Sequence, residues 1–115
     1  YRKAVEHGNA NAQFSLGACY SYAEGVAEDA AEAVKWYRKA AEQGHGEAQR
    51  NLGSAYLHGA GVAKDYVEAY KWLNLAAAHG HEYARKNRDS LEQMMTPAQI
   101  AEGQRLSREF TPQRR

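Results

Sequence analysis

The sequence predicts an all-α fold, a right-handed α/α solenoid built from repeated pairs of helices. Residues 1–36 and 37–72 align without a gap and are identical at 19 of 36 positions. Alanine supplies 22 of the 115 residues, whereas there are only two Phe and two Met. A repeat of this length is typical of solenoids, whose units bury their apolar faces against one another. The small side chains favour close packing of helices over a thick core.

The first helix of each unit is predicted from apolar residues at helical spacing. In the first unit this helix should run from about Ala10 to Tyr22, and its counterpart lies one period later. Each helix contains a central glycine, Gly17 or Gly53, although glycine in a helix costs roughly 1 kcal/mol relative to alanine. A glycine kept in both copies indicates that a neighbouring helix approaches closely at this point.

The second helix of each unit is predicted from its start and stop signals. The segments 29–32 and 65–68 have capping-box spacing, so Asp29 and Asp65 are expected as N-caps. Gly44 and Gly80 are expected as the left-handed residues that end these helices. The buried faces are expected to carry Ala33, Trp36, Tyr37, Ala40 and Ala41 in the first unit, and Ala69, Trp72, Leu73, Ala76 and Ala77 in the second.

The C-terminal part of the chain departs from the repeat. A third copy begins at Leu73 and fades, and its apolar stripe is expected at Ala84, Leu91, Met94 and Met95. The segment 96–99 then offers an N-cap Thr, a Pro at the first helical position and a Gln at the third, which predicts a further helix. Residues 96–110 are therefore expected to form a C-terminal capping helix, with Ile100, Leu106 and Phe110 on its apolar side.

The predicted organisation has three parts. Residues 1–95 are repeats, comprising the end of one unit, two full 36-residue periods and a degenerate last unit. Residues 96–110 are the capping helix, and residues 111–115 are a tail. Because residues 1–8 match the end of a second helix, the chain is expected to start in mid-unit, either trimmed or preceded by further repeats.

The repeated motifs resemble a known family. The segments 16–20 and 52–56 have the Leu-Gly-x-x-Tyr spacing of the tetratricopeptide repeat, whose period is about 34 residues. Together with Gly-Val-x-x-Asp and the run Trp-Tyr-Arg-Lys-Ala-Ala-Glu-Gln-Gly at residues 36–44, the pattern is similar to the Sel1-like repeat over residues 1 to about 95. The resemblance implies a bacterial adaptor or scaffold that binds other proteins without a cofactor or chemistry of its own. It leaves the compartment open between cytoplasm and periplasm.

Composition and motifs disfavour several other classes of function. The 15 Lys+Arg and 14 Asp+Glu give a net charge of +1, which offers no electrostatic basis for binding nucleic acid. The longest aliphatic run, residues 75–78, is too short to span a bilayer. The segment His79-Gly80-His81-Glu82 has the letters of a metal site, but no third ligand follows at a suitable spacing. We interpret its histidines, and His45 one period earlier, as solvated residues between helices.

Two alternatives to an adaptor follow from the resemblance and from the truncated pattern. Some cysteine-rich relatives of the Sel1-like family are described as β-lactamases, and they use paired cysteines within each repeat. Here Cys19 is the only cysteine, so a buried inert thiol is expected and an enzyme is not. The other alternative is a purely structural role at the end of a larger scaffold.

Candidate binding residues follow from the resemblance, because first helices line the concave groove of tetratricopeptide-like arrays. Counting from the Leu-Gly anchor selects Asn11, Phe14, Ser21 and Tyr22 in the first unit, Glu47, Arg50, Ser54 and His58 in the second, and Tyr83 and Lys86 in the third, with Met94 in the row of Tyr22 and His58. A peptide or a partner helix is expected to lie there. Arg50 and Lys86 together are expected to receive a carboxylate, either an acidic side chain or a C-terminus.

Overall fold

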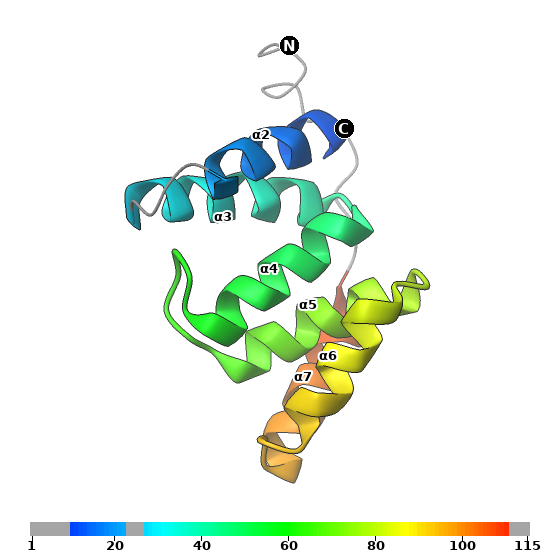
Figure 1. Ribbon diagram of the computed structural model, residues 1–115. Coiled ribbons are helices and arrows are strands. Elements are labelled where there is room, and N and C mark those ends of the chain that lie inside the picture. The colour runs from blue at the N-terminus through cyan, green and yellow to red at the C-terminus, as the bar shows by residue number, and fades with distance from the viewer. Residues whose placement is uncertain (1–9, 23–26, 111–115) are drawn as a thin grey trace.

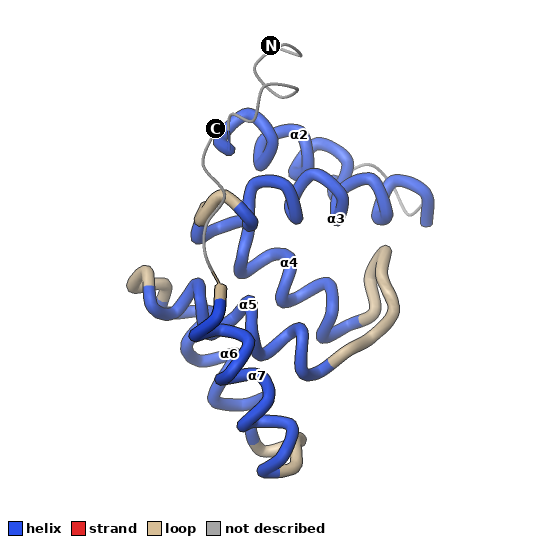
Figure 2. The backbone as a smooth tube through the Cα atoms, turned by 180° about the vertical axis from the view of Figure 1, so that it is seen from behind, coloured by secondary structure: helices blue, strands red, loops and turns tan. Residues whose placement is uncertain are grey.

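The computed structural model describes residues 10–22 and 27–110, and every regular element in these two ranges is a helix. Helices α2 to α6 stack in chain order, and α7 packs against α5 (Figure 1); short turns and loops join α3 to α7 at the edges of the stack (Figure 2). The side chains of residues 16, 19–22 and 27–29 lie outside the description, and with them the predicted burial of the Cys19 thiol. The helices are α2 (Ala10–Tyr22), α3 (Ala27–Glu42), α4 (Gly46–His58), α5 (Tyr66–Ala78), α6 (Glu82–Glu92) and α7 (Pro97–Glu109).

The fold is the predicted solenoid of helix pairs, with α2 packed on α3 and α4 packed on α5. The bounds of α2 are those expected from the apolar spacing. Turns of the same construction join α3 to α4 and α5 to α6. In each, a glycine takes a positive φ, 91° at Gly44 and 84° at Gly80, and the next residue donates its N–H to a carbonyl five positions back. The glycine itself donates its N–H to the carbonyl three positions back, and the two bonds together form the Schellman motif. The predicted helix ends at Gly44 and Gly80 are therefore confirmed.

Close approach within each helix pair explains the two repeated glycines. A Cβ placed on Gly17 would lie 2.9 Å from the Tyr37 ring, and one on Gly53 would lie 2.9 Å from Cγ of Leu73. In both pairs the carbonyl of a second-helix alanine would lie 3.2 Å away. The prediction that these glycines mark a helix contact is confirmed, because any side chain there would displace the partner helix.

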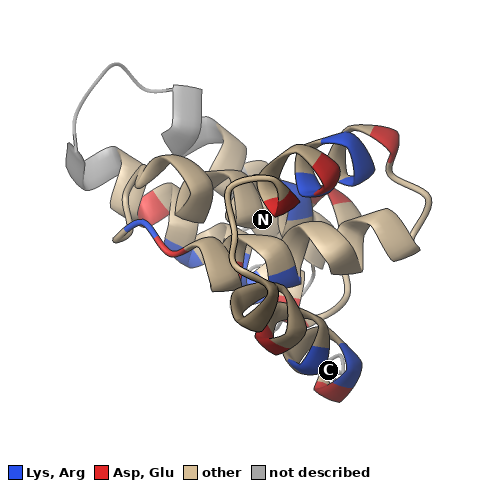
Figure 3. Ribbon diagram, turned by 90° about the horizontal axis from the view of Figure 1, so that it is seen from below, with Lys and Arg blue, Asp and Glu red and all other residues tan. Residues whose placement is uncertain are grey.

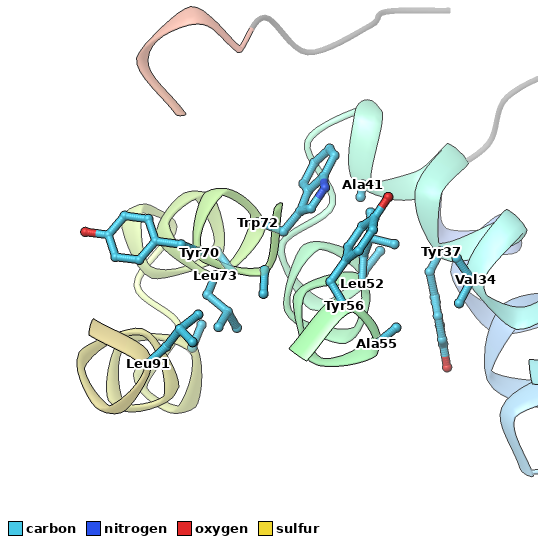
Figure 4. Close-up of a cluster of buried hydrophobic side chains, with 14 of the residues drawn as sticks. Val34, Tyr37, Ala41, Leu52, Ala55, Tyr56, Tyr70, Trp72, Leu73 and Leu91 are labelled. Carbon is cyan, nitrogen blue, oxygen red and sulfur yellow. The ribbon is translucent and has the colours of Figure 1, made fainter. Parts of the chain in front are cut away.

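A continuous core runs from α3 to α6 (Figure 4). Leu52, Leu73 and Leu91 come from three successive helices, and each is at most 1% exposed. Trp72 is also buried, whereas its equivalent Trp36 is only half-buried. The tryptophan of α5 is therefore more deeply buried than that of α3, although the two helices occupy equivalent places in the repeat.

Two details of the prediction are wrong. Helix α3 begins at Ala27, so Asp29 lies inside the first turn and is not the N-cap. An acidic residue in the first turn interacts favourably with the helix dipole, and the residue pattern does not distinguish this role from capping. Met94 does not belong to the buried stripe: α6 ends at Glu92, and Met94 follows in a turn and is 56% exposed. The equivalent prediction for Asp65 is confirmed, since its carboxylate accepts the Glu68 N–H at 3.1 Å.

Helix α7 begins with the predicted capping box. The Thr96 hydroxyl accepts the Gln99 N–H, the Gln99 side chain accepts the Thr96 N–H, and Pro97 occupies the first turn. The helix packs against α5, which also contacts α6. Gly103 allows this approach, because a Cβ there would lie 2.6 Å from Cδ1 of Tyr70.

Tyr70 joins the three C-terminal helices. Its hydroxyl, on α5, donates to the Glu92 carboxylate of α6 at 2.7 Å and accepts from the Gln104 amide of α7 at 3.4 Å. Burial, with the hydrogen bond to Glu92, raises the pKa of Tyr70, so the hydroxyl stays protonated and remains a donor. The residue at the equivalent place in α3 is Val34, which cannot form these bonds.

We expect Tyr70→Phe to lower the free energy of unfolding by about 1 kcal/mol, because one charge-assisted hydrogen bond is lost while the half-buried carboxylate stays hydrated. Urea denaturation followed by circular dichroism measures the change. Tyr66→Phe, on the same helix, is the matched control, since its hydroxyl has no hydrogen bond among the described residues. Equal effects of the two substitutions would contradict this role of the Tyr70 hydroxyl.

Candidate functional site

The predicted binding residues lie on α2, α4 and α6, the first helices of the three units. We call the described members of this set the first-helix face: Asn11, Phe14, Glu47, Arg50, Ser54, His58, Tyr83 and Lys86. The side chains of Ser21 and Tyr22, also predicted, lie outside the described residues.

Asn11, Glu47 and Tyr83 occupy equivalent positions in the three units, and we call them the first row of this face. This row connects successive units. Asn11 Oδ1 lies 3.0 Å from Nε2 of His45, and Glu47, one period later, forms the same contact with His81. The third member, Tyr83, is 70% exposed, with its ring centroid 6.5 Å from that of His81. Two of the three residues in this row therefore have partners inside the protein, and Tyr83 presents its ring to solvent.

The two histidines in these contacts are helix N-caps. Nδ1 of His45 accepts the Ala48 N–H at 3.2 Å, and Nδ1 of His81 accepts the Ala84 N–H at 3.4 Å. Because Nδ1 is the acceptor, the ring proton of the neutral form is on Nε2, which donates to Asn11 or Glu47. The interpretation as merely solvated histidines missed this role. The available signal was the position of each histidine directly after a terminating glycine and directly before a helix.

Phe14, Arg50 and Lys86 form the second row, at equivalent positions in the three units. Phe14 was expected to face a bound partner, but its ring packs within the protein. The Phe14 ring stacks on His45, with centroids 4.7 Å apart, and lies 5.6 Å from the Tyr37 ring. It is half-buried and packs against the core. Phe14 thus supports the junction between units, so its substitution would alter the fold as well as any binding surface.

Arg50 and Lys86 complete the second row. The Arg50 guanidinium lies 3.8 Å from the Glu47 carboxylate, and its Nε is buried without a hydrogen-bond partner among the described residues. Lys86 is exposed on α6. Neighbouring cations on α6 are paired, Arg85 with Glu82 at 3.1 Å and Arg88 with Asp89 at 3.0 Å. The row therefore presents a half-buried guanidinium and an exposed ammonium.

The rest of the face becomes more open toward the C-terminus. Ser54 is half-buried in the middle of α4, and His58 is exposed at its end. On the third unit Tyr83 and Lys86 are exposed, and so is Met94 in the turn after α6. Among the described residues, Tyr83 and Met94 are the exposed large hydrophobic side chains. An aromatic ring and a flexible thioether at the surface are typical anchors for a protein partner.

Charges of both signs are interspersed along the helices (Figure 3). Among the side chains that the structure describes, no three His, Cys, Asp or Glu come together as a metal site would require. Over residues 10–22 and 27–110, no helix combines the length and the apolar character needed to cross a membrane.

The fold and its repeated junctions define the chain as an α/α solenoid of short helix pairs. The Sel1 repeat family matches residues 10–45 and 46–81, two units of the predicted period. The chain belongs to the Sel1 repeat family. A search among curated protein sequences returned no match.

The solved structures similar to this chain include two bacterial repeat proteins. One is a protective antigen present in uropathogenic Escherichia coli strains and displaying an SLR fold: it is 38% identical, superposes with a TM-score of 0.87, and matches over 95% of this chain and 24% of its own length. The other is a Sel1 repeat protein from Oxalobacter formigenes, 45% identical with a TM-score of 0.70, over 76% of this chain and 36% of its own length. The chain spans about a quarter to a third of these proteins. Sel1 repeat proteins are generally protein-interaction modules, and their fold typically serves as a scaffold without enzymatic activity.

Proposed function

We propose that this chain binds a peptide or a helix of a partner protein along the first-helix face, mainly on α6. The observation that carries the proposal is the exposed strip formed by Tyr83, Lys86 and Met94. Tyr83 and Lys86 are three residues apart on α6 and are therefore neighbours on one side of this helix, and Met94 follows in the turn after it. A strip of this kind provides apolar area at its ends and a charge between them.

The chemistry of the second row supports a carboxylate on the partner. The contact of the half-buried Arg50 guanidinium with Glu47, at 3.8 Å, is long for an ion pair. A guanidinium binds a carboxylate through two parallel hydrogen bonds, and Lys86 adds a second positive charge. The carboxylate would come from an acidic side chain or a C-terminus. Residues 96–110 are proposed to act beside this face as the helix that ends the array.

Selection from a random peptide display library tests the proposal and requires no assumption about the identity of the partner. Enriched peptides are expected to shift the NMR amide signals of α4 and α6, and Tyr83→Ala with Lys86→Ala is expected to weaken their binding about tenfold. Phe14 is left intact because it supports the fold.

Lys35→Ala, at an exposed position of the second helix α3, is the matched control and should leave peptide affinity unchanged. Failure to enrich any peptide, or binding that Tyr83→Ala with Lys86→Ala leaves intact, would refute the proposal.

A further inference from the structure

The two methionines of the chain are adjacent in the sequence and lie in opposite environments. Met94 is 56% exposed, whereas Met95 is 8% exposed and belongs to the hydrophobic core. Both follow the end of α6, in the short segment that leads to α7. This segment therefore presents one thioether to solvent and holds the other inside the protein.

Backbone hydrogen bonds hold both methionines in place. The N–H of Met94 donates to the Leu91 carbonyl at 2.9 Å, and the N–H of Met95 donates to the Glu92 carbonyl at 3.3 Å. The next residue, Thr96, is the N-cap of α7. The exposure of Met94 is therefore a property of a defined turn between two helices, and the burial of Met95 anchors that turn to the core.

An exposed thioether is open to two-electron oxidants such as hydrogen peroxide. A lone pair of the sulfur attacks one peroxide oxygen, and the S–O bond forms as the O–O bond breaks. The hydrogen on the transferred oxygen passes to the departing oxygen, so the products are a sulfoxide and water. The sulfur loses two electrons and the peroxide gains them. The oxidant must reach the sulfur, which burial prevents.

We propose that Met94 is a site of oxidative modification, converted to the sulfoxide by hydrogen peroxide, while burial protects Met95. The modification changes the surface and spares the fold, because Met94 lies outside the core cluster that includes Met95 and Leu91. A sulfoxide at Met95 would instead place a polar oxygen in that core. Sulfoxide formation is reversible by methionine sulfoxide reductases, so the change at Met94 can be undone.

The position of Met94 gives the modification a consequence for binding, and this consequence rests on the proposed function. Met94 supplies apolar area to the exposed strip that also contains Tyr83 and Lys86. The sulfoxide replaces a flexible apolar side chain by a polar one. Oxidation of Met94 therefore weakens a partner that uses this anchor.

Mass spectrometry of the full chain tests the modification site without any binding partner. The folded chain is treated with hydrogen peroxide, and digestion with fragment sequencing then locates each added oxygen, so oxidation of Cys19 is scored separately. Met94 should be oxidised at least about fivefold faster than Met95, in line with their exposed fractions of 56% and 8%. In denaturing urea the two rates should become equal. Equal rates in the folded chain would overturn the proposal.

Binding of peptides selected by display tests the consequence, with peptides that contain neither Met nor Cys. After removal of the peroxide, the oxidised chain should bind them about fivefold more weakly, with an unchanged circular dichroism spectrum. Treatment with a methionine sulfoxide reductase should restore the affinity.

Met94→Leu is the matched control, because leucine keeps the apolar area but has no thioether. Peroxide should leave the affinity of this variant unchanged. An equal loss of affinity in Met94→Leu and in the parent chain would assign the effect to another residue and refute the role of Met94. The oxidation rates are measured without a peptide, so failure of this site and failure of the proposed function are distinguishable.

Discussion

Trp72→Ala is expected to destabilise the protein by about 3–5 kcal/mol, the largest effect of any single truncation considered. Trp72 is 2% exposed in the middle of the core and contacts the Phe110 ring edge-on, with centroids 5.5 Å apart. The Lys71 ammonium lies 4.3 Å from the centre of the indole and adds a cation–π contact. Truncation would leave a cavity between α5 and the end of α7 that backbone relaxation fills only in part.

Trp36→Ala is the matched control, since Trp36 occupies the equivalent place on α3 but is only half-buried. Its ring contacts are with two lysines, Lys35 at 5.3 Å and Lys39 at 4.7 Å from its centre. We expect a loss of about 1–2 kcal/mol, from modest burial and exposed cation–π contacts. The midpoints of urea unfolding measure both effects. Equal losses would mean that repeat position, not burial, sets the contribution of these residues.

Gly53→Ala is expected to destabilise the protein by about 2 kcal/mol, although alanine is the better helix former. Higher helix propensity would contribute about 1 kcal/mol of stability. The new Cβ would lie 2.9 Å from Cγ of Leu73, which is fully buried, and 3.2 Å from the Ala69 carbonyl. Neither neighbour can rotate away, so α4 and α5 must separate, and such overpacking costs about 3 kcal/mol.

Gly46→Ala, in the same helix, separates packing from propensity. A Cβ there would lie 3.6 Å from Cβ of His79, an ordinary contact distance. We expect unchanged or slightly higher stability, by up to about 1 kcal/mol. Thermal and urea unfolding of the two variants should therefore move in different directions, and a stabilised Gly53→Ala protein would disprove the close helix contact as the reason for this glycine.

The repeat made most of the fold predictable. Identity between two copies shows which positions matter before any contact is seen, so Gly17 and Gly53 could be assigned to a helix contact, and Gly44 and Gly80 to helix ends. Local signals also sufficed for α7, because Thr96 and its capping box depend on residues four positions apart or fewer. The same local reasoning failed at Asp29, where an N-cap and a first-turn acid share one residue preference.

The candidate site was less predictable, because its residues interact across units. The helical register places Asn11 and Glu47 near the surface, but it does not reveal that they pair with His45 and His81, 34 residues later. Counting from the Leu-Gly anchor places Phe14 at a position that Arg50 and Lys86 occupy in the other units, and the structure shows the Phe14 ring stacked on His45. A residue that breaks the repeat can serve the junction between units as readily as a partner.

The sequence by itself determined the helix-pair architecture, its 36-residue period and most helix ends, since these follow from propensity, capping and repetition along the chain. Only the tertiary structure decided which equivalent residues differ in environment. Trp72 is buried where Trp36 is half-buried. Tyr70 forms hydrogen bonds with two other helices where Val34 has no polar side-chain atom, and Tyr83 is exposed where Glu47 is paired. The physical reason is that α7 does not continue the repeat but packs against α5. Residues of α5 therefore contact a helix that has no counterpart beside α3.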